Sequence, residues 1–490
     1  YNCVASYKAT QLKKQYRNKK YVNAKRIIMP KKTKLKNSNK MDMINGPIWN
    51  KLPRFALPVA ATAILEQLFN ASDIAVVGNF TGAAKTASVA AVGANSPVIG
   101  LILNLFIGIA LGTNVIIANA IGRDDRETVQ RAVHTSVLTA IIGGFLVMIP
   151  GEIFAVQILS AMSIPEDVLP YAVLYLRIYL LGLPVILLYN FLSAVFRSVG
   201  DTKTPLIVLA LSGCLNVLLN LFFVIVLKMT VNGVAIATVI SNAISSIVLF
   251  IVLMKSDKYI KLSLRELRID KRVLGQILEI GLPAGLQSAV FAISNIIIQA
   301  AINSLGTIVI AASSAAFNIE VIAYDVFNSF SQACTTFVGQ NYGAGKLDRC
   351  KKTLLLSIAE DTIATAVTIG LVLFSGRFLL SIFTSDPQVI ELGYTRLLLI
   401  FSAYTFSMLY EIMSGYLRGF GISLVPALLT TIGVCGTRVF WIYVVFPSSP
   451  TFKTIMYAYP ISLSLTAVLI FIALLAYHPS RRFKGAVSAE

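Results

Sequence analysis

Long apolar stretches without a single charged residue dominate this chain. They include the segments between Lys85 and Arg123, Lys203 and Lys228, Lys228 and Lys255, and Glu279 and Glu320. A helix needs about 20 apolar residues to cross the hydrocarbon core of a bilayer, and each of these segments is long enough to do so. They also lack the two-residue alternation of a membrane β-strand. We therefore predict an all-α polytopic membrane protein.

Turn signals divide the apolar sequence into twelve expected transmembrane helices. Positions such as Pro165, Pro205, Asn232-Gly233 and Pro426 mark the boundaries between them. The expected spans are residues 53–79, 88–119, 132–159, 168–197, 204–228, 233–255, 273–303, 309–341, 352–375, 391–418, 425–447 and 453–477.

The formal net charge of +19 is distributed unevenly along the chain. Residues 1–54 hold fifteen Lys and Arg against one acidic residue, Asp42, and so account for +14 of the total. In the rest of the chain, the loops expected on one side of the membrane hold 20 basic residues and those on the other side hold 4. Because Lys and Arg concentrate in cytosolic loops, both termini are predicted to be cytosolic.

Four segments follow from this pattern. They are a basic N-terminal tail at 1–46, a six-helix lobe at 47–258, a second six-helix lobe at 259–478 and a cytosolic tail at 479–490. The N-terminal tail lacks the apolar core of a signal peptide. Its composition fits either translated upstream sequence, with Met41 or Met43 as the native start, or a disordered tail that lies against anionic lipid.

The two expected lobes repeat each other in sequence. Leu57-Pro58 recurs as Leu282-Pro283 at an offset of 225, and the segment 196–200 recurs as 417–421 at an offset of 221. Because six helices is an even number, both copies enter the membrane from the same side and are related by an axis along its normal. Such a pair of lobes is predicted to enclose a central cleft and to rock between inward-open and outward-open states.

The first expected helix carries a polar stripe. Thr62, Glu66, Asn70 and Asp73 follow spacings of four, four and three residues and so share one helix face. Carboxylates inside a bilayer are costly unless they are paired, protonated or hydrated. We expect a proton or cation site at Asp73, with Glu66 and Asn70 beside it. A structural hydrogen bond between helices is the alternative for either acid.

Other polar residues lie within the later expected helices. Asn216 and Asn220, one turn apart, either ligate a cation together with the stripe or hold helices together. Arg438 is expected to balance one of the embedded acids or to extend toward a membrane interface. The residues expected to line a substrate cavity are Gln287, Asn295, Glu320, Asn328, Tyr410, Glu411 and Arg438.

The sequence lacks the motifs of several other function classes. It contains no GxxxxGK[ST] phosphate-binding loop and no recognisable nucleophile with its base. Its five cysteines lack CxxC spacing, and the two histidines, His134 and His478, lie far apart in sequence. We expect no enzymatic activity, no cofactor, no nucleic-acid partner and no metal centre other than Na⁺ at Asp73.

Several short motifs resemble those of the multidrug and toxic compound extrusion (MATE) family. The most specific are the segment 336–345, TFVGQNYGAG, and the segment 73–78, DIAVVG. Supporting motifs are Leu57-Pro58, Ala91-Val92-Gly93, Gly281-Leu282-Pro283 and the two Arg-x-x-Gly segments at 197–200 and 418–421. The resemblance covers residues 47 to 478.

This resemblance implies an antiporter that exports amphiphilic, often cationic, drugs in exchange for Na⁺ or H⁺. Asp73 matches the aspartate that family members use for ion coupling, and Asn216 matches a polar position near it. Asn220 stands where many relatives have an aspartate, and Glu66 is a candidate to replace that charge. The glutamate that one branch carries near Phe291 is absent here, so Asp73 is the preferred coupling residue.

One alternative function is left open. A flippase of lipid-linked saccharides, or another metabolite exporter of the same superfamily, needs a cationic cleft to bind pyrophosphate. Arg438 is the clearest membrane-embedded base in the sequence, against several acids, so we favour drug export. The expected partners are small-molecule drugs or organic cations and the lipid bilayer. The expected form is a monomer in the cell membrane of a prokaryote.

Overall fold

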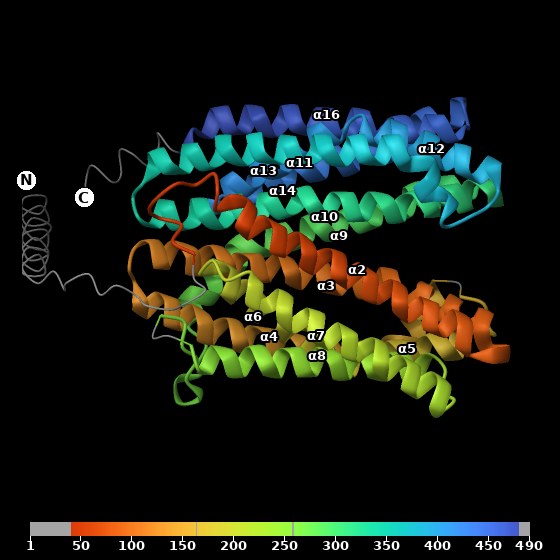
Figure 1. Ribbon diagram of the computed structural model, residues 1–490, viewed down its shortest axis with the longest axis horizontal. Coiled ribbons are helices and arrows are strands. Elements are labelled where there is room, and N and C mark those ends of the chain that lie inside the picture. The colour runs from red at the N-terminus through yellow and green to blue at the C-terminus, as the bar shows by residue number, and fades with distance from the viewer. Residues whose placement is uncertain (1–40, 163, 257–258, 480–490) are drawn as a thin grey trace, which may run out of the picture. The chain divides into compact units, whose positions relative to one another are not determined.

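Within the described residues, 41–162, 164–256 and 259–479, the computed structural model is all helical (Figure 1). The N-terminal half contains α2 (Leu52–Phe80), α3 (Lys85–Gly122), α4 (Arg126–Ala161), α5 (Leu169–Leu181), α6 (Leu183–Ser198), α7 (Lys203–Leu221) and α8 (Val231–Met254). The C-terminal half contains α9 (Lys271–Asn303), α10 (Thr307–Gly343), α11 (Leu347–Ser381), α12 (Pro387–Phe401), α13 (Tyr404–Gly419), α14 (Leu424–Thr430), α15 (Thr437–Phe440) and α16 (Phe452–Tyr477). Short 3-10 or π-helical segments lie at Gly82–Ala84, Phe222–Val226, Leu264–Glu266, Thr431–Gly436, Trp441–Val445 and Phe446–Ser448.

Nine helical segments in this part of the chain are long and apolar enough to cross a membrane, and two bent helix pairs raise the number to as many as eleven. The pair α5 and α6 bends by 51°, and the pair α12 and α13 bends by 45°. The prediction of single helices at 168–197 and 391–418 was therefore wrong. Pro184 explains the first break, because its missing N–H cannot continue the hydrogen-bond pattern of α5.

The helix α2 is 29 residues long but is not one of these eleven apolar spans. It carries Glu66, Asn70 and Asp73, which lower its mean hydropathy. α2 packs against α7 of its own half and against α10 of the other half. It therefore links the polar stripe to both halves of the molecule.

The buried apolar side chains form two large cores, one mainly in each half, and a smaller third core in which Met43, Ile48 and α2 pack against α10. One core extends from Val76 to Ile277, and a second extends from Ile298 to Ile470. Figure 1 shows α3 to α8 toward one side and α10 to α16 toward the other, with α2 and α9 between them. We call the helices of the N-terminal half the first lobe and those of the C-terminal half the second lobe.

The lobes meet along α3 and α9 at a set of close-packed glycines, Gly108, Gly112, Gly281 and Gly285, which we call the glycine seam. A Cβ atom at Gly108 would lie 2.2 Å from the backbone nitrogen of Gly285, and one at Gly112 would lie 2.2 Å from the Ile277 carbonyl oxygen. Small residues let membrane helices approach this closely. Nearby, Thr336 Oγ1 donates to Asn114 Oδ1 at 3.0 Å across the lobes.

Residues 41–46, predicted above to belong to the N-terminal tail, pack against the second lobe. Met43 is buried, and its carbonyl oxygen accepts hydrogen bonds from Asn341 Nδ2 at 3.1 Å and from Arg349 Nη2 at 3.2 Å. The folded region therefore begins before residue 47. The rest of the predicted N-terminal tail, residues 1–40, and most of the predicted C-terminal tail, residues 480–490, lie outside the described residues.

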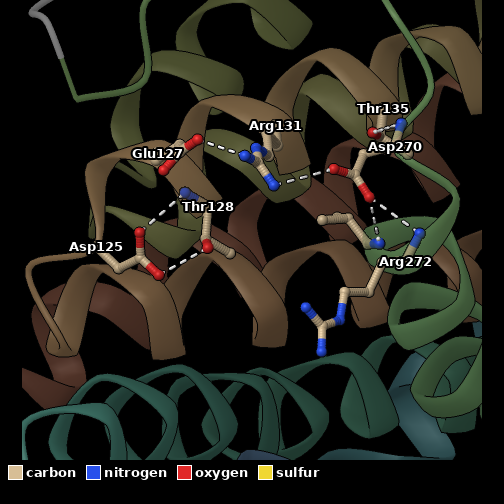
Figure 2. A network of polar contacts seen from close by, with 8 residues as sticks. Asp125, Glu127, Thr128, Arg131, Thr135, Asp270 and Arg272 are labelled. Atoms are coloured by element: carbon tan, nitrogen blue, oxygen red, sulfur yellow. Dashed lines mark hydrogen bonds and ion pairs between the residues drawn. The ribbon is translucent and has the colours of Figure 1, made fainter. Parts of the chain in front are cut away.

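A polar network anchors the segment between the lobes to α4 (Figure 2). Asp270 precedes α9, and its Oδ1 accepts the N–H of Val273 at 3.1 Å. Its Oδ2 lies 3.3 Å from Arg131 Nη1, and its own N–H donates to Thr135 Oγ1 at 3.0 Å. The Val273 N–H and the Arg131 charge help to lower the pKa of the Asp270 carboxyl. Arg131 also contacts Glu127, so both acids hold one guanidinium in place.

Replacement of Gly112 by Val is expected to disrupt contact between the lobes. The new side chain would overlap the Ile277 carbonyl and the Gly281 backbone, and overpacking of this kind costs about 1–3 kcal/mol of stability. Differential scanning fluorimetry of the purified protein should show a lower midpoint. Gly100→Val, on the same helix with open space around its Cβ, is the matched control. An equal midpoint for the two variants would contradict close packing at the seam.

Candidate functional site

A cavity of about 450 Å³ lies between the lobes, and we call it the central cavity. On α3 its wall extends from Asn104 to Asn114, and on α9 from Ala284 to Asn295. The stretch on α3 overlaps the glycine seam, because it includes Gly108 and continues past Gly112 to Asn114. The seam therefore forms part of the cavity wall, on the side where α3 and α9 meet.

The seven residues predicted to line a substrate cavity are all on the wall of the central cavity. They come from α9, α10, α13 and α15, and are Gln287, Asn295, Glu320, Asn328, Tyr410, Glu411 and Arg438. Their role in binding remains a prediction. Apolar and aromatic side chains such as Phe291, Phe317, Tyr404 and Leu463 complete the wall.

Both carboxylates on this wall form ion pairs with arginines. Arg396 on α12 makes a two-pronged contact with Glu320, with Nε to Oε1 at 2.6 Å and Nη2 to Oε2 at 2.8 Å. Glu411 Oε2 lies 3.9 Å from Arg418 Nη1, and its Oε1 accepts from the Tyr324 hydroxyl at 3.0 Å. Neither acid is therefore an isolated negative charge.

Arg438 on α15 lies on the same wall, between two π-helical segments. Its Nε donates to Ser462 Oγ at 3.2 Å, and its guanidinium carbon lies 4.2 Å from the centre of the Tyr459 ring. The side chain is buried, and among the described residues no carboxylate lies within 4.0 Å of it. Arg438 thus neither balances an acid nor extends to an interface, contrary to both predictions.

Arg197 and Arg418 were not among the residues predicted to line a cavity, and the structure places both on the wall of the central cavity. They end α6 and α13, occupy corresponding positions of the two repeats and line the central cavity. Arg197 Nη1 donates to Gln332 Oε1 at 2.8 Å, and Arg418 Nη2 donates to Gln287 Oε1 at 3.0 Å. The sequence does not reveal this position, because a basic residue at a helix end can face either water or a cavity.

A second, smaller cavity of about 130 Å³, the side cavity, lies within the first lobe. Glu66, Asn70, Asp73 and Asn216 line it, so four of the five predicted ion-coupling residues come together there. The fifth, Asn220, is fully buried and reaches Asp73 from α7. Ile107 is on the wall of both cavities, which places them next to each other.

Asp73 is held at both carboxylate oxygens. Asn220 Nδ2 donates to Oδ1 at 2.6 Å, and Thr238 Oγ1 donates to Oδ2 at 2.9 Å. Asn216 Oδ1 accepts from Asn220 Nδ2 at 3.2 Å. The carboxylate is 5% exposed, and in the described part of the chain it has no basic partner within 4.0 Å. The group is thus oriented by neutral donors and keeps an uncompensated charge when it is ionised.

Thr238 on α8 was missed from the sequence. The signal was available, because Thr238, Ser241, Asn242 and Ser245 recur at spacings of three and four and form a polar stripe on an otherwise apolar helix. Three of them line the side cavity: Thr238, Ser241 and Asn242. Glu66 and Asn70 share the cavity wall with Asp73, yet no hydrogen bond joins either of them to it among the described residues.

Comparison with known proteins identifies the family to which this architecture belongs. The family model MatE matches residues 58–222 and again residues 283–444, once in each lobe. Two relatives are named probable multidrug resistance proteins. YoeA of Bacillus subtilis is 26% identical over 399 residues, which is 80% of this chain and 86% of YoeA. NorM of Thermotoga maritima is 28% identical over 401 residues, which is 80% of this chain and 84% of NorM.

A third relative and a solved structure extend the comparison. A protein of Shewanella oneidensis named FAD transporter is 24% identical over 353 residues, which is 71% of this chain and 77% of that protein. The outward-facing structure of a multidrug resistance MATE family transporter superposes with a TM-score of 0.82 and 21% identity, and covers 93% of this chain and all of that one. The bacterial relatives and the apolar helices indicate a transporter of a prokaryotic membrane. Because the family model matches both lobes over most of their length, the chain belongs to the MatE family of transporters.

Proposed function

We propose that this protein is a secondary active exporter of small amphiphilic molecules, including drugs, in exchange for Na⁺ or H⁺. One observation carries the proposal: a central cavity lies between two repeated lobes, which meet along the glycine seam. Alternating access requires a cavity between two rigid bodies whose contacts open on one side as they close on the other. One chain supplies every residue on the wall of the cavity, which supports action as a monomer.

The proposed topology has twelve spans with both termini in the cytosol. Adding α2 to the eleven spans found by length and composition gives an even number. At the end that carries the turns after α3 and α10, with Arg123 and Lys346, the lobes are in close contact, because a Cβ atom at Gly343 would lie 2.0 Å from the Asn119 carbonyl oxygen. Because basic turns favour the cytosol, this end is proposed to be cytosolic and the described state to face outward.

The proposed coupling site is the Asp73 cluster. Binding of H⁺ or Na⁺ would neutralise Asp73 and change its hydrogen bonds with Asn220 and Thr238. These partners belong to α7 and α8, while α2 itself contacts α10 of the second lobe. A change in the hydrogen bonds of Asp73 would thus be transmitted through α2 to the contact between the lobes. In this way a bound ion would shift the equilibrium between the inward-open and outward-open states.

The coupling ion can be identified in liposomes that contain the purified protein. Transport of two dyes, rhodamine 123 and carboxyfluorescein, is measured under a Na⁺ gradient alone and under a pH gradient alone. We expect one gradient to accelerate transport of at least one dye and the other gradient to have no effect, because a single carboxylate cluster serves one coupling reaction. Protein-free liposomes are the control. Equal transport with and without both gradients would contradict antiport.

A flippase of lipid-linked saccharides, or an exporter of another metabolite, is the second candidate. The arginines on the wall of the central cavity favour it, since pyrophosphate binds best to guanidinium groups. The name of the Shewanella relative, FAD transporter, also points to metabolites. Arg438→Ala in a lipid-flipping assay separates the candidates, because a flippase should lose activity and a drug exporter should show none.

A further inference from the structure

The charges on the wall of the central cavity do not balance. Four guanidinium groups line it against two carboxylates, and they are Arg197, Arg396, Arg418 and Arg438 with Glu320 and Glu411. At neutral pH every arginine is ionised, so the wall carries more positive than negative charge. The acids that would balance this count, Asp73 and Glu66, line the side cavity instead.

Two of the four arginines form ion pairs with the wall carboxylates, so the excess positive charge belongs to the other two, Arg197 and Arg438. Arg396 forms an ion pair with Glu320 through two contacts, and Arg418 forms an ion pair with Glu411. In the described part of the chain, Arg197 and Arg438 have no carboxylate within 4.0 Å. These two cations, which form no ion pair in that part of the chain, come one from each lobe. Glu66 of the side cavity acts on the Arg197 charge from beyond 4.0 Å and balances it only in part.

The neighbours of Arg438 and Arg197 are neutral hydrogen-bond partners. Arg438 Nε donates to Ser462 Oγ, and its guanidinium lies over the Tyr459 ring. Arg197 donates to the Gln332 side chain at 2.8 Å and to the Ser193 carbonyl at 3.4 Å. Such partners orient a guanidinium without neutralising it. A charge held in this way inside a membrane protein is costly unless a counter-charge arrives.

We propose that the central cavity binds an amphiphilic organic anion, whose acidic group contacts Arg438 and Arg197 and whose apolar body packs on the aromatic wall. The inference rests on the proposed function, since it takes the central cavity as the transport site. Guanidinium groups bind carboxylate, sulfonate and phosphate oxygens through charge-assisted hydrogen bonds. Phe291, Phe317 and Tyr404 supply the apolar surface. A cation would find both wall carboxylates already paired with arginines.

Two dyes with one ring system and opposite charge test this selectivity. Carboxyfluorescein is anionic and rhodamine 123 is cationic, and both contain a xanthene core. Fluorescence anisotropy with the purified full-length protein should show at least about tenfold tighter binding of carboxyfluorescein, the effect of one charge-assisted hydrogen bond. Tighter binding of rhodamine 123 by the wild type would overturn the proposal without any variant having to fold.

The variants locate the site. Arg438→Gln and Arg197→Gln should each weaken carboxyfluorescein binding about tenfold, and the double variant should lose the preference for the anion. Arg438→Lys keeps the charge and should retain most of the affinity. Arg377→Gln is the matched control, because Arg377 is exposed and pairs with Glu391 outside the cavity. Wild-type affinity in the double variant would place the anion elsewhere and overturn the proposal.

Anion binding and ion-coupled transport are measured separately, so failure of the anion-site proposal can be distinguished from failure of the antiport proposal. Selective binding of carboxyfluorescein without any gradient-driven transport would overturn antiport and leave the anion site in place. Gradient-driven transport of rhodamine 123 without binding of carboxyfluorescein would overturn the anion site and leave antiport in place.

Discussion

Asp73→Asn is expected to abolish ion-coupled efflux while the protein still inserts and folds. The substitution keeps the size of the side chain and removes its negative charge. Asn220 and Thr238 orient both oxygens of Asp73, and no base near it takes up the charge in the described chain. The charge is thus available to a coupling ion. Gradient-driven dye transport should fall at least about tenfold, within the usual range of coupling between two sites.

Asp386→Asn provides the matched control for this variant. It makes the same chemical change at a residue that caps α12 through the Gln388 N–H at 2.8 Å and lines neither cavity. Because Asn and Asp cap helices about equally well, transport should be unchanged. Dye flux down its own gradient, without any ion gradient, should also survive in Asp73→Asn. Gradient-driven efflux at the wild-type rate in that variant would show that the ion binds elsewhere.

Arg396→Met is expected to cause the largest loss of stability. Arg396 and Glu320 are 3% and 6% exposed and share two short contacts. Removal of the arginine leaves a buried carboxylate without its counter-charge, which costs about 3–5 kcal/mol. Thermal unfolding of the purified protein should show a much lower midpoint than the wild type.

Arg377→Met is the control, since Arg377 makes a similar two-pronged contact with Glu391 on the surface. The side chains of that pair are 58% and 59% exposed, so water screens the charges and the change should leave the midpoint close to that of the wild type. The double variant Arg396→Met with Glu320→Leu should recover most of the lost stability, because it removes both buried charges. Equal midpoints for Arg396→Met and Arg377→Met would show that burial does not strengthen the first pair.

The two-lobe plan could be predicted because its signals are local. Apolar runs of membrane length indicate helices wherever they occur, and the repeated Leu-Pro and Arg-x-x-Gly segments indicate two related copies. The breaks between α5 and α6 and between α12 and α13 could not be predicted in the same way, because both flanking segments are apolar and together long enough for one span. The helical spacing of polar residues also predicted which of them share a helix face. It placed Glu66, Asn70 and Asp73 together, and in the structure all three line the side cavity.

The net charge on the wall of the central cavity could be determined only from the tertiary structure. Arg396 and Glu320 are 76 residues apart, and Arg197 and Gln332 are 135 apart, so no local pattern pairs them. The sequence alone determined which polar residues enter the membrane, because hydropathy and helical periodicity depend on near neighbours. The packing of α6, α12, α13 and α15 around one cavity decided which of those charges cancel. Electrostatic energy depends on distance in space, and among the residues that the structure describes Arg197 and Arg438 have no carboxylate within 4.0 Å.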